Sequence, residues 1–129
     1  MIYLDSCILI YAIEDRGTRG GRAREAMRGV QKTLIVSPLV LHECLVRPLR
    51  EGDVEMRQRF LAVYDRLVHV DLESPVFVEA AELRAKHGLK APDSLHLAAA
   101  QLSGCDELWT NDKRLVSASH GLAVDIIGE

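Results

Sequence analysis

The stretch MIYLDSCILIYAIE, residues 1–14, runs from one apolar segment through a carboxylate into a second apolar segment. Residues 1–4 have the character of a buried strand, and residues 6–14 place their apolar side chains at helical spacing, with Ser6 available as a cap. Asp5 stands between the two segments, where an unpaired charge would be costly to desolvate. We therefore expect a strand followed by a helix, with Asp5 paired, hydrogen-bonded or bound to a metal at the junction.

The rest of the chain alternates short segments of strand character with helical segments, and residues 33–36 are rich in β-branched side chains. We predict further strands at residues 33–36, 67–70, 107–110 and 122–126. We predict a turn at residues 18–21 and helices at residues 22–31, 38–48, 54–66, 75–87, 92–104 and 112–117, with Gly88 as a helix C-cap and Pro48 as a helix stop. Strands separated by helices indicate βαβ units. We therefore expect an α/β fold, a three-layer α/β/α sandwich around a central, mainly parallel sheet of about five short strands.

Length and composition favour one globular domain over residues 1–129. Hydrophobic residues make up 48% of the chain and charged residues 27%, which argues against a disordered or membrane protein. The longest apolar run, residues 7–13, is too short to span a bilayer, so we expect a cytoplasmic protein with no membrane partner. The three cysteines are far apart, which fits neither a zinc site nor a disulfide framework.

Four acidic residues follow the predicted strands or open the predicted helices. Asp5 and Asp112 come directly after strands, Glu43 lies one turn into a helix, and Asp93 lies in the first turn of another. Ligands of open parallel sheets bind at the carboxyl ends of the strands, so the four acids could meet at one edge. Such a cluster would repel itself unless it held a divalent cation, and Mg²⁺ prefers carboxylate ligands. Taken singly, Asp93 also fits a helix-capping acid, Glu43 a solvated helix residue and Asp112 a turn residue.

The order of motifs resembles that of the PIN-domain ribonucleases, especially the VapC-type toxins of toxin-antitoxin pairs. The matching segments are YLDSCILIYAIE (residues 3–14), SPLVLHECL (37–45), PDSLHLAAA (92–100) and WTNDKRL (109–115). Each motif alone is weak, but four in the same order across essentially the whole chain make a specific signal.

This resemblance implies a metal-dependent ribonuclease with a PIN-like fold. Asp5, Glu43, Asp93 and Asp112 match the catalytic acids that hold Mg²⁺ or Mn²⁺. Ser6, Thr110 and Asn111 match neighbouring polar residues that would orient the acids or water, although a helix cap or a strand-end hydrogen bond explains them equally well. The resemblance further implies an RNA substrate, a cognate antitoxin that covers the acidic groove, and a homodimer.

Basic residues after the first helix are candidate RNA contacts. Arg24, Arg28 and Lys32 share one predicted helix face, where they could bind phosphates, although a solvated face is an equally economical interpretation. His96 lies one turn after Asp93 and is a further candidate for a substrate contact, although a lone His on an apolar helix is more often structural.

Two other functions stay open at this point. An aspartyl-phosphate phosphotransferase would use Asp5 as its nucleophile, but such enzymes usually carry a second acid two positions on, where this chain has Cys7. A non-catalytic PIN-fold module would keep the fold and bind RNA or protein without cleavage.

Overall fold

The computed structural model describes residues 1–128. Its elements in chain order are β1 (Ile2–Leu4), α1 (Ser6–Glu14), α2 (Thr18–Gly29), β2 (Leu34–Val36), α3 (Pro38–Glu51), α4 (Val54–Arg66), β3 (Val68–His69), α5 (Ser74–His87), α6 (Ala91–Leu102), β4 (Glu107–Trp109), α7 (Lys113–Ala118) and β5 (Ala123–Val124). The alternation of strands with helices confirms the α/β class expected from the sequence.

The strands form one parallel sheet in the order β3-β2-β1-β4-β5. Tyr3 of β1 pairs with Ile35 on one side, and Leu4 pairs with Trp109 on the other. The chain builds outward from β1 in one direction and then returns to add β4 on the opposite side. The carboxyl end of β1, beside that of β4, is therefore the switch point at which parallel sheets bind ligands.

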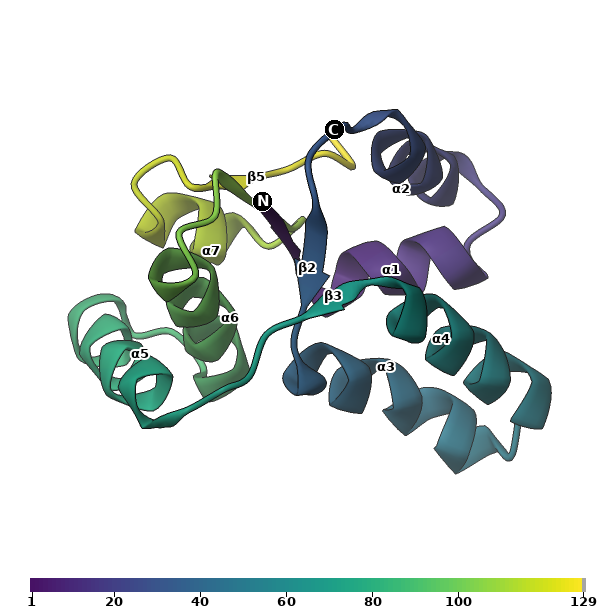
Figure 1. Ribbon diagram of the computed structural model, residues 1–129, viewed down its shortest axis with the longest axis horizontal. Coiled ribbons are helices and arrows are strands. Elements are labelled where there is room, and N and C mark those ends of the chain that lie inside the picture. Colours follow the sequence, from purple (N-terminus) through teal and green to yellow (C-terminus); the bar gives the residue numbers. More distant parts are fainter. Residues whose placement is uncertain (129) are drawn as a thin grey trace.

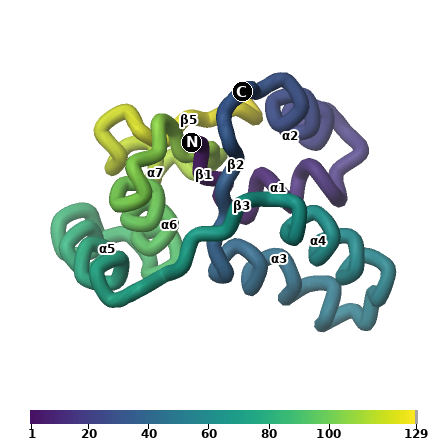
Figure 2. Tube along the Cα trace, viewed as in Figure 1, coloured from purple at the N-terminus to yellow at the C-terminus, as the bar shows by residue number. Residues whose placement is uncertain are grey.

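Helices cover both faces of the sheet and confirm the three-layer architecture. Figure 1 shows α1 to α4 on one side of the central strands and α5, α6 and α7 on the other. The contacts follow the same division, because α1 touches α2, α3 and α4, whereas α6 touches α5 and α7. The trace in Figure 2 places β1 in the middle of the molecule, between the two groups of helices.

The core is centred on β1. All three residues of this strand are buried, and Tyr3 and Leu4 have no exposed surface. A strand that is covered on both faces has a continuous run of apolar residues. This explains why the sequence before Asp5 does not alternate between polar and apolar residues. Asp5, rather than Ser6, is the N-cap residue of α1, because its side chain accepts a hydrogen bond from the Ser6 amide.

The predicted turn at residues 18–21 is wrong, because α2 already begins at Thr18. Glycines in this segment suggested a turn, but Gly20 is buried where α2 crosses the end of α1. Its amide donates to the Asp15 carboxylate at 2.7 Å, and a Cβ on Gly20 would lie 2.0 Å from the Asp15 carbonyl oxygen. Gly20 is therefore a helix residue that permits a close approach of two backbones.

Pro48 does not stop α3, which continues to Glu51. The missing amide of a proline inside a helix removes one hydrogen bond, and the helix extends only a short way beyond it. Gly52, in the left-handed conformation, ends the helix, and the Gly52 amide bonds to the carbonyl of Leu49. Gly88 ends α5 in the same conformation, as the sequence predicted.

The last strand is shorter than predicted and comprises only Ala123–Val124. Among residues 1–128, no helix combines the length and the apolar character that crossing a lipid bilayer would require.

Candidate active site

Asp5 lies at the carboxyl end of β1 and is almost buried, with 7% of its surface exposed. Both of its carboxylate oxygens accept hydrogen bonds. The Ser6 amide donates to Oδ1 at 2.7 Å, and the Thr110 hydroxyl donates to Oδ2 at 2.7 Å. The Asp5 amide in turn bonds to the Trp109 carbonyl of β4, which fixes the backbone at the switch point. The carboxylate is thus held in one orientation before any ligand binds.

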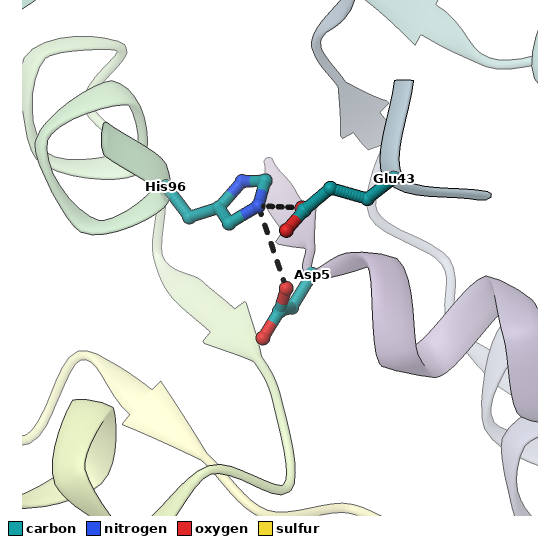
Figure 3. A group of neighbouring side chains, drawn as sticks. All are labelled: Asp5, Glu43 and His96. Atoms are coloured by element: carbon teal, nitrogen blue, oxygen red, sulfur yellow. Dashed lines mark hydrogen bonds and ion pairs between the residues drawn. The ribbon is translucent and has the colours of Figure 1, made fainter. Parts of the chain in front are cut away.

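Glu43 of α3 and His96 of α6 converge on Asp5 (Figure 3). His96 Nε2 lies 2.5 Å from Glu43 Oε1 and 3.6 Å from Asp5 Oδ1. Burial alone would raise the pKa of Glu43, but the hydrogen bond and charge of His96 outweigh burial and lower it. Burial would lower the pKa of His96, yet the hydrogen bond to Glu43 and the charge of Asp5 raise it instead. His96 and Glu43 therefore stabilise each other's charged forms, and the charge of Asp5 adds to the effect on His96.

Asp93 and Asp112 stand at the starts of α6 and α7 and lie outside the tight cluster of Asp5, Glu43 and His96. Asp112 caps α7 by accepting from the Arg114 amide at 2.8 Å. Burial raises the pKa of Asp93, and the negative charges of Asp112 and Asp5 raise it further. The four acids thus share one electrostatic neighbourhood, as the sequence led us to expect, although only two of them are in close contact.

The raised pKa of Asp93 predicts a measurable dependence of stability on pH. The folded protein holds this proton more tightly than the unfolded chain, so the free energy of unfolding falls as pH rises past the ordinary Asp range. In the absence of metal, Asp93→Asn should therefore raise the melting temperature by a few degrees at about pH 7 and have little effect at about pH 3. Thermal unfolding followed by circular dichroism would measure both values.

Asp65→Asn, at an exposed position of α4, is the matched control for loss of one negative charge. A shift in melting temperature that is the same for Asp93→Asn at both pH values would contradict the unfavourable ionisation of Asp93.

The polar residues expected beside the acids differ in their contacts. Thr110 donates to Asp5 and accepts from the Asp112 amide at 3.0 Å, so one hydroxyl joins the two acidic residues. The Ser6 hydroxyl lies 3.4 Å from Asp5 Oδ1. The Asn111 amide group instead donates to the Tyr11 hydroxyl at 3.2 Å.

The basic residues that we considered as RNA contacts are engaged within the protein. Arg24 donates to the carbonyl oxygens of Ala12 and Asp15, at 3.1 and 2.7 Å, and so ties α2 to the end of α1. Lys32 lies 3.5 Å from the Asp106 carboxylate. Arg28 reaches back to the carbonyl of Arg24 at 3.4 Å. Their role toward RNA stays a prediction.

His96 has no exposed surface in this conformation, which fits the structural role that the sequence analysis weighed against an RNA contact. A contact of His96 with RNA stays a prediction. The structure instead reveals a buried hydrogen-bond chain to His96 through two residues that the sequence analysis did not single out. The Tyr3 hydroxyl lies 2.8 Å from His96 Nδ1 and 2.7 Å from the Ser37 hydroxyl, and all three groups are buried. The sequence feature that could have indicated these contacts is the presence of two hydroxyl groups, those of Tyr3 and Ser37, in segments expected to be buried.

The cluster suits a hard divalent cation. The polar atoms of Asp5, Glu43 and His96 that form the cluster all lie within 4.8 Å of one another, and the two carboxylates are its candidate ligands for a cation. Two carboxylates attract Mg²⁺ or Mn²⁺, and Asp93 nearby supplies further negative charge. The donor chemistry therefore fits the ion that the four acids led us to expect.

Comparison with known proteins finds one family model and several solved structures that are similar to this chain. A family model described as "PIN domain" matches residues 2–120. No curated protein matches the chain significantly.

Several solved structures share the fold. A toxin-antitoxin complex from Klebsiella pneumoniae is 22% identical, covers 98% of each chain and has a TM-score of 0.81. The sarcin-ricin loop cleaving toxin VapC20 of Mycobacterium tuberculosis is 15% identical over 92% of this chain and 95% of its own, with a TM-score of 0.80. VapBC2 of Rickettsia felis, bound to a promoter DNA fragment, is 22% identical over 96% of this chain and 98% of its own, with a TM-score of 0.76.

Proposed function

Because the chain belongs to the PIN domain family, we propose that it is a metal-dependent ribonuclease that acts as the toxin of a toxin-antitoxin pair. The observation that carries this proposal is the convergence of Asp5 and Glu43 at the switch point of the sheet, with Asp93 and Asp112 in the same electrostatic neighbourhood. Repulsion within such a cluster of acids destabilises the folded protein. A requirement for a bound cation would explain why the acids lie together.

In this proposal Asp5, Glu43, Asp93 and Asp112 hold Mg²⁺ or Mn²⁺. The bound cation would polarise the RNA phosphodiester and neutralise the charge that develops on the departing 3′ oxygen. The protein's own part is to keep the acids in place. Thr110 and the Ser6 amide fix the two oxygens of Asp5, and Thr110 also fixes the backbone of Asp112. Rigid ligands of this kind lower the reorganisation that binding and catalysis require.

We further propose an antitoxin as partner, with the toxin assembled as a homodimer. Two of the similar structures are described as a toxin-antitoxin complex and as VapBC2, and a third is described as a toxin that cleaves the sarcin-ricin loop. An acidic cluster that attracts a metal ion would equally attract a cationic side chain of an inhibitory partner. Co-purification with a small protein encoded by a neighbouring gene would support this part of the proposal.

The function is tested by incubating a mixed pool of tRNA and ribosomal RNA with the wild-type protein and with Asp112→Asn purified identically. We expect discrete fragments from the wild type in Mg²⁺ or Mn²⁺, none in EDTA, and none from the variant. Asparagine caps helices as well as aspartate does, so α7 should persist in Asp112→Asn. Mass spectrometry of the preparation would verify that no inhibitory partner is present. Partner-free wild type that binds RNA in Mn²⁺ without cutting it would favour a non-catalytic module.

A further inference from the structure

A chain of hydrogen bonds runs from the protein interior to Glu43. It begins at the Ser37 hydroxyl, which lies 2.7 Å from the Tyr3 hydroxyl, and continues over 2.8 Å to His96 Nδ1. It ends where His96 Nε2 meets Glu43 Oε1 at 2.5 Å. Ser37, Tyr3 and His96 have no exposed surface, whereas the Glu43 side chain is 28% exposed. The chain therefore connects the core to a carboxylate at the surface.

The direction of the last hydrogen bond follows from its partners. The lowered pKa of Glu43 favours its carboxylate form, and at 2.5 Å an imidazole lone pair would repel that carboxylate, so Nε2 of His96 carries a proton and donates a hydrogen bond to Glu43. A protonated Nε2 has no lone pair left for a metal ion. Nδ1 faces the Tyr3 hydroxyl, which can donate to a neutral ring or accept from a charged one. In either state His96 acts on Glu43 and is not itself a ligand.

Glu43 needs such a restraint more than Asp5 does. Asp5 has a short side chain that both Ser6 and Thr110 hold, whereas Glu43 has one more rotatable bond and is the most exposed of the three clustered side chains. Holding a long carboxylate in one rotamer before a ligand arrives removes an entropic cost from binding. His96 also lies one helical turn after Asp93, so it links the position of Glu43 in α3 to that of α6.

We infer that His96 is a positioning residue, which binds Oε1 of Glu43 so that the other carboxylate oxygen is directed to a divalent cation. This inference rests on the proposed metal-dependent function, and Tyr3 and Ser37 take part by fixing the imidazole. It replaces the RNA contact considered from the sequence with a structural task inside the protein.

The test measures Mn²⁺ affinity by the electron paramagnetic resonance signal of free Mn²⁺, which needs no RNA and no turnover. His96→Leu removes both ring nitrogens, and we expect it to weaken Mn²⁺ binding by about 10- to 100-fold. His96→Gln keeps an N–H group at the position of Nε2 and should recover most of the affinity. Tyr3→Phe should weaken binding severalfold, because it removes only the hydroxyl that orients His96.

Ser119→Ala is the matched control for the loss of a buried hydroxyl. Ser119 bonds to Val116 and Ala123 and takes no part in the chain that ends at Glu43, so this variant should bind Mn²⁺ like the wild type. A proton spectrum supplies an independent signature, since the downfield resonance of the Nε2 proton should disappear in Glu43→Gln and persist in Ser119→Ala.

The possible outcomes separate the inference from the function on which it rests. Mn²⁺ affinity that is equal in His96→Gln and His96→Leu, and lower than in the wild type, would make His96 a direct ligand and overturn the inference. Wild-type affinity in His96→Leu would also overturn it. If His96→Leu does not fold, equal affinities of Tyr3→Phe and Ser119→Ala decide against it. A wild-type protein that binds no Mn²⁺ would overturn the proposed function and the inference together.

Discussion

Replacing Asp5 by Asn is expected to slow RNA cleavage by about 10³-fold, equivalent to about 4 kcal/mol of lost transition-state stabilisation. The reason is the position of Asp5 beside Glu43 at the switch point of the sheet, where we propose that its charge holds the metal ion. An amide has no negative charge and offers only one oxygen to a cation. Single-turnover cleavage of a defined RNA fragment would measure the change.

The fold should tolerate this substitution. The remaining oxygen can still accept from the Ser6 amide, and the new amino group can donate to Thr110, whose hydroxyl is free to reverse its direction. Asp53→Asn is the matched control, because Asp53 also caps a helix, α4, by accepting from the Met56 amide at 3.0 Å. An Asp5→Asn variant that cleaves RNA as fast as Asp53→Asn would refute the role of Asp5.

Gly20→Ala is expected to destabilise the protein by about 3 kcal/mol and lower its melting temperature by about 10 °C. The new methyl carbon would lie 2.0 Å from the carbonyl oxygen of Asp15 and 2.8 Å from that of Tyr11, both of which are backbone atoms of α1 and its C-cap. Neither atom can move without separating α2 from α1. Chemical denaturation followed by circular dichroism would give the free energy of unfolding.

The neighbouring Gly21 provides a direct comparison. A Cβ at this position meets no atom within 4 Å, and the residue lies in the same helix. Gly21→Ala should therefore stabilise the protein by about 0.5–1 kcal/mol, because alanine loses less backbone entropy than glycine when a helix forms. Equal effects of the two substitutions would mean that α1 and α2 do not approach as closely as described.

The architecture was predictable because it depends on patterns that extend over many residues. The buried run before Asp5 and the β-branched segment at residues 33–36 mark strands, and helical segments between strands favour a parallel sheet. The start of α2 and the continuation of α3 beyond Pro48 were not predictable in this way. The start of α2 depends on tertiary context, because the contact of Gly20 with Asp15 outweighs the local preference of glycine for a turn. The end of α3 lies at Gly52, whose left-handed conformation ends the helix, rather than at Pro48.

The neighbourhood of the four acids was predictable from their places after strands and at helix starts. Which of the four acids lie in the tight cluster was not predictable. Asp5 and Glu43 lie together because β1 and α3 place them at the same edge, whereas Asp93 lies outside the cluster and is affected by the charges of Asp112, Asp5 and Glu43. The place of His96 in the interior depends on the hydroxyl of Tyr3, which comes from a distant part of the chain. Single-sequence patterns do not report such long-range polar contacts.

The central position of β1 has a consequence for the synthesis of the protein on the ribosome. β1 is synthesised before β2, but one of its two neighbours in the sheet, β4, follows it in the chain only after about 100 further residues have been added. Asp5 and its hydrogen-bond donor Thr110 are 105 positions apart in the sequence. Contacts of such long range form late in folding. A nascent or truncated chain that lacks β4 therefore cannot assemble the proposed nuclease site, so any activity of that site has to await the synthesis of β4.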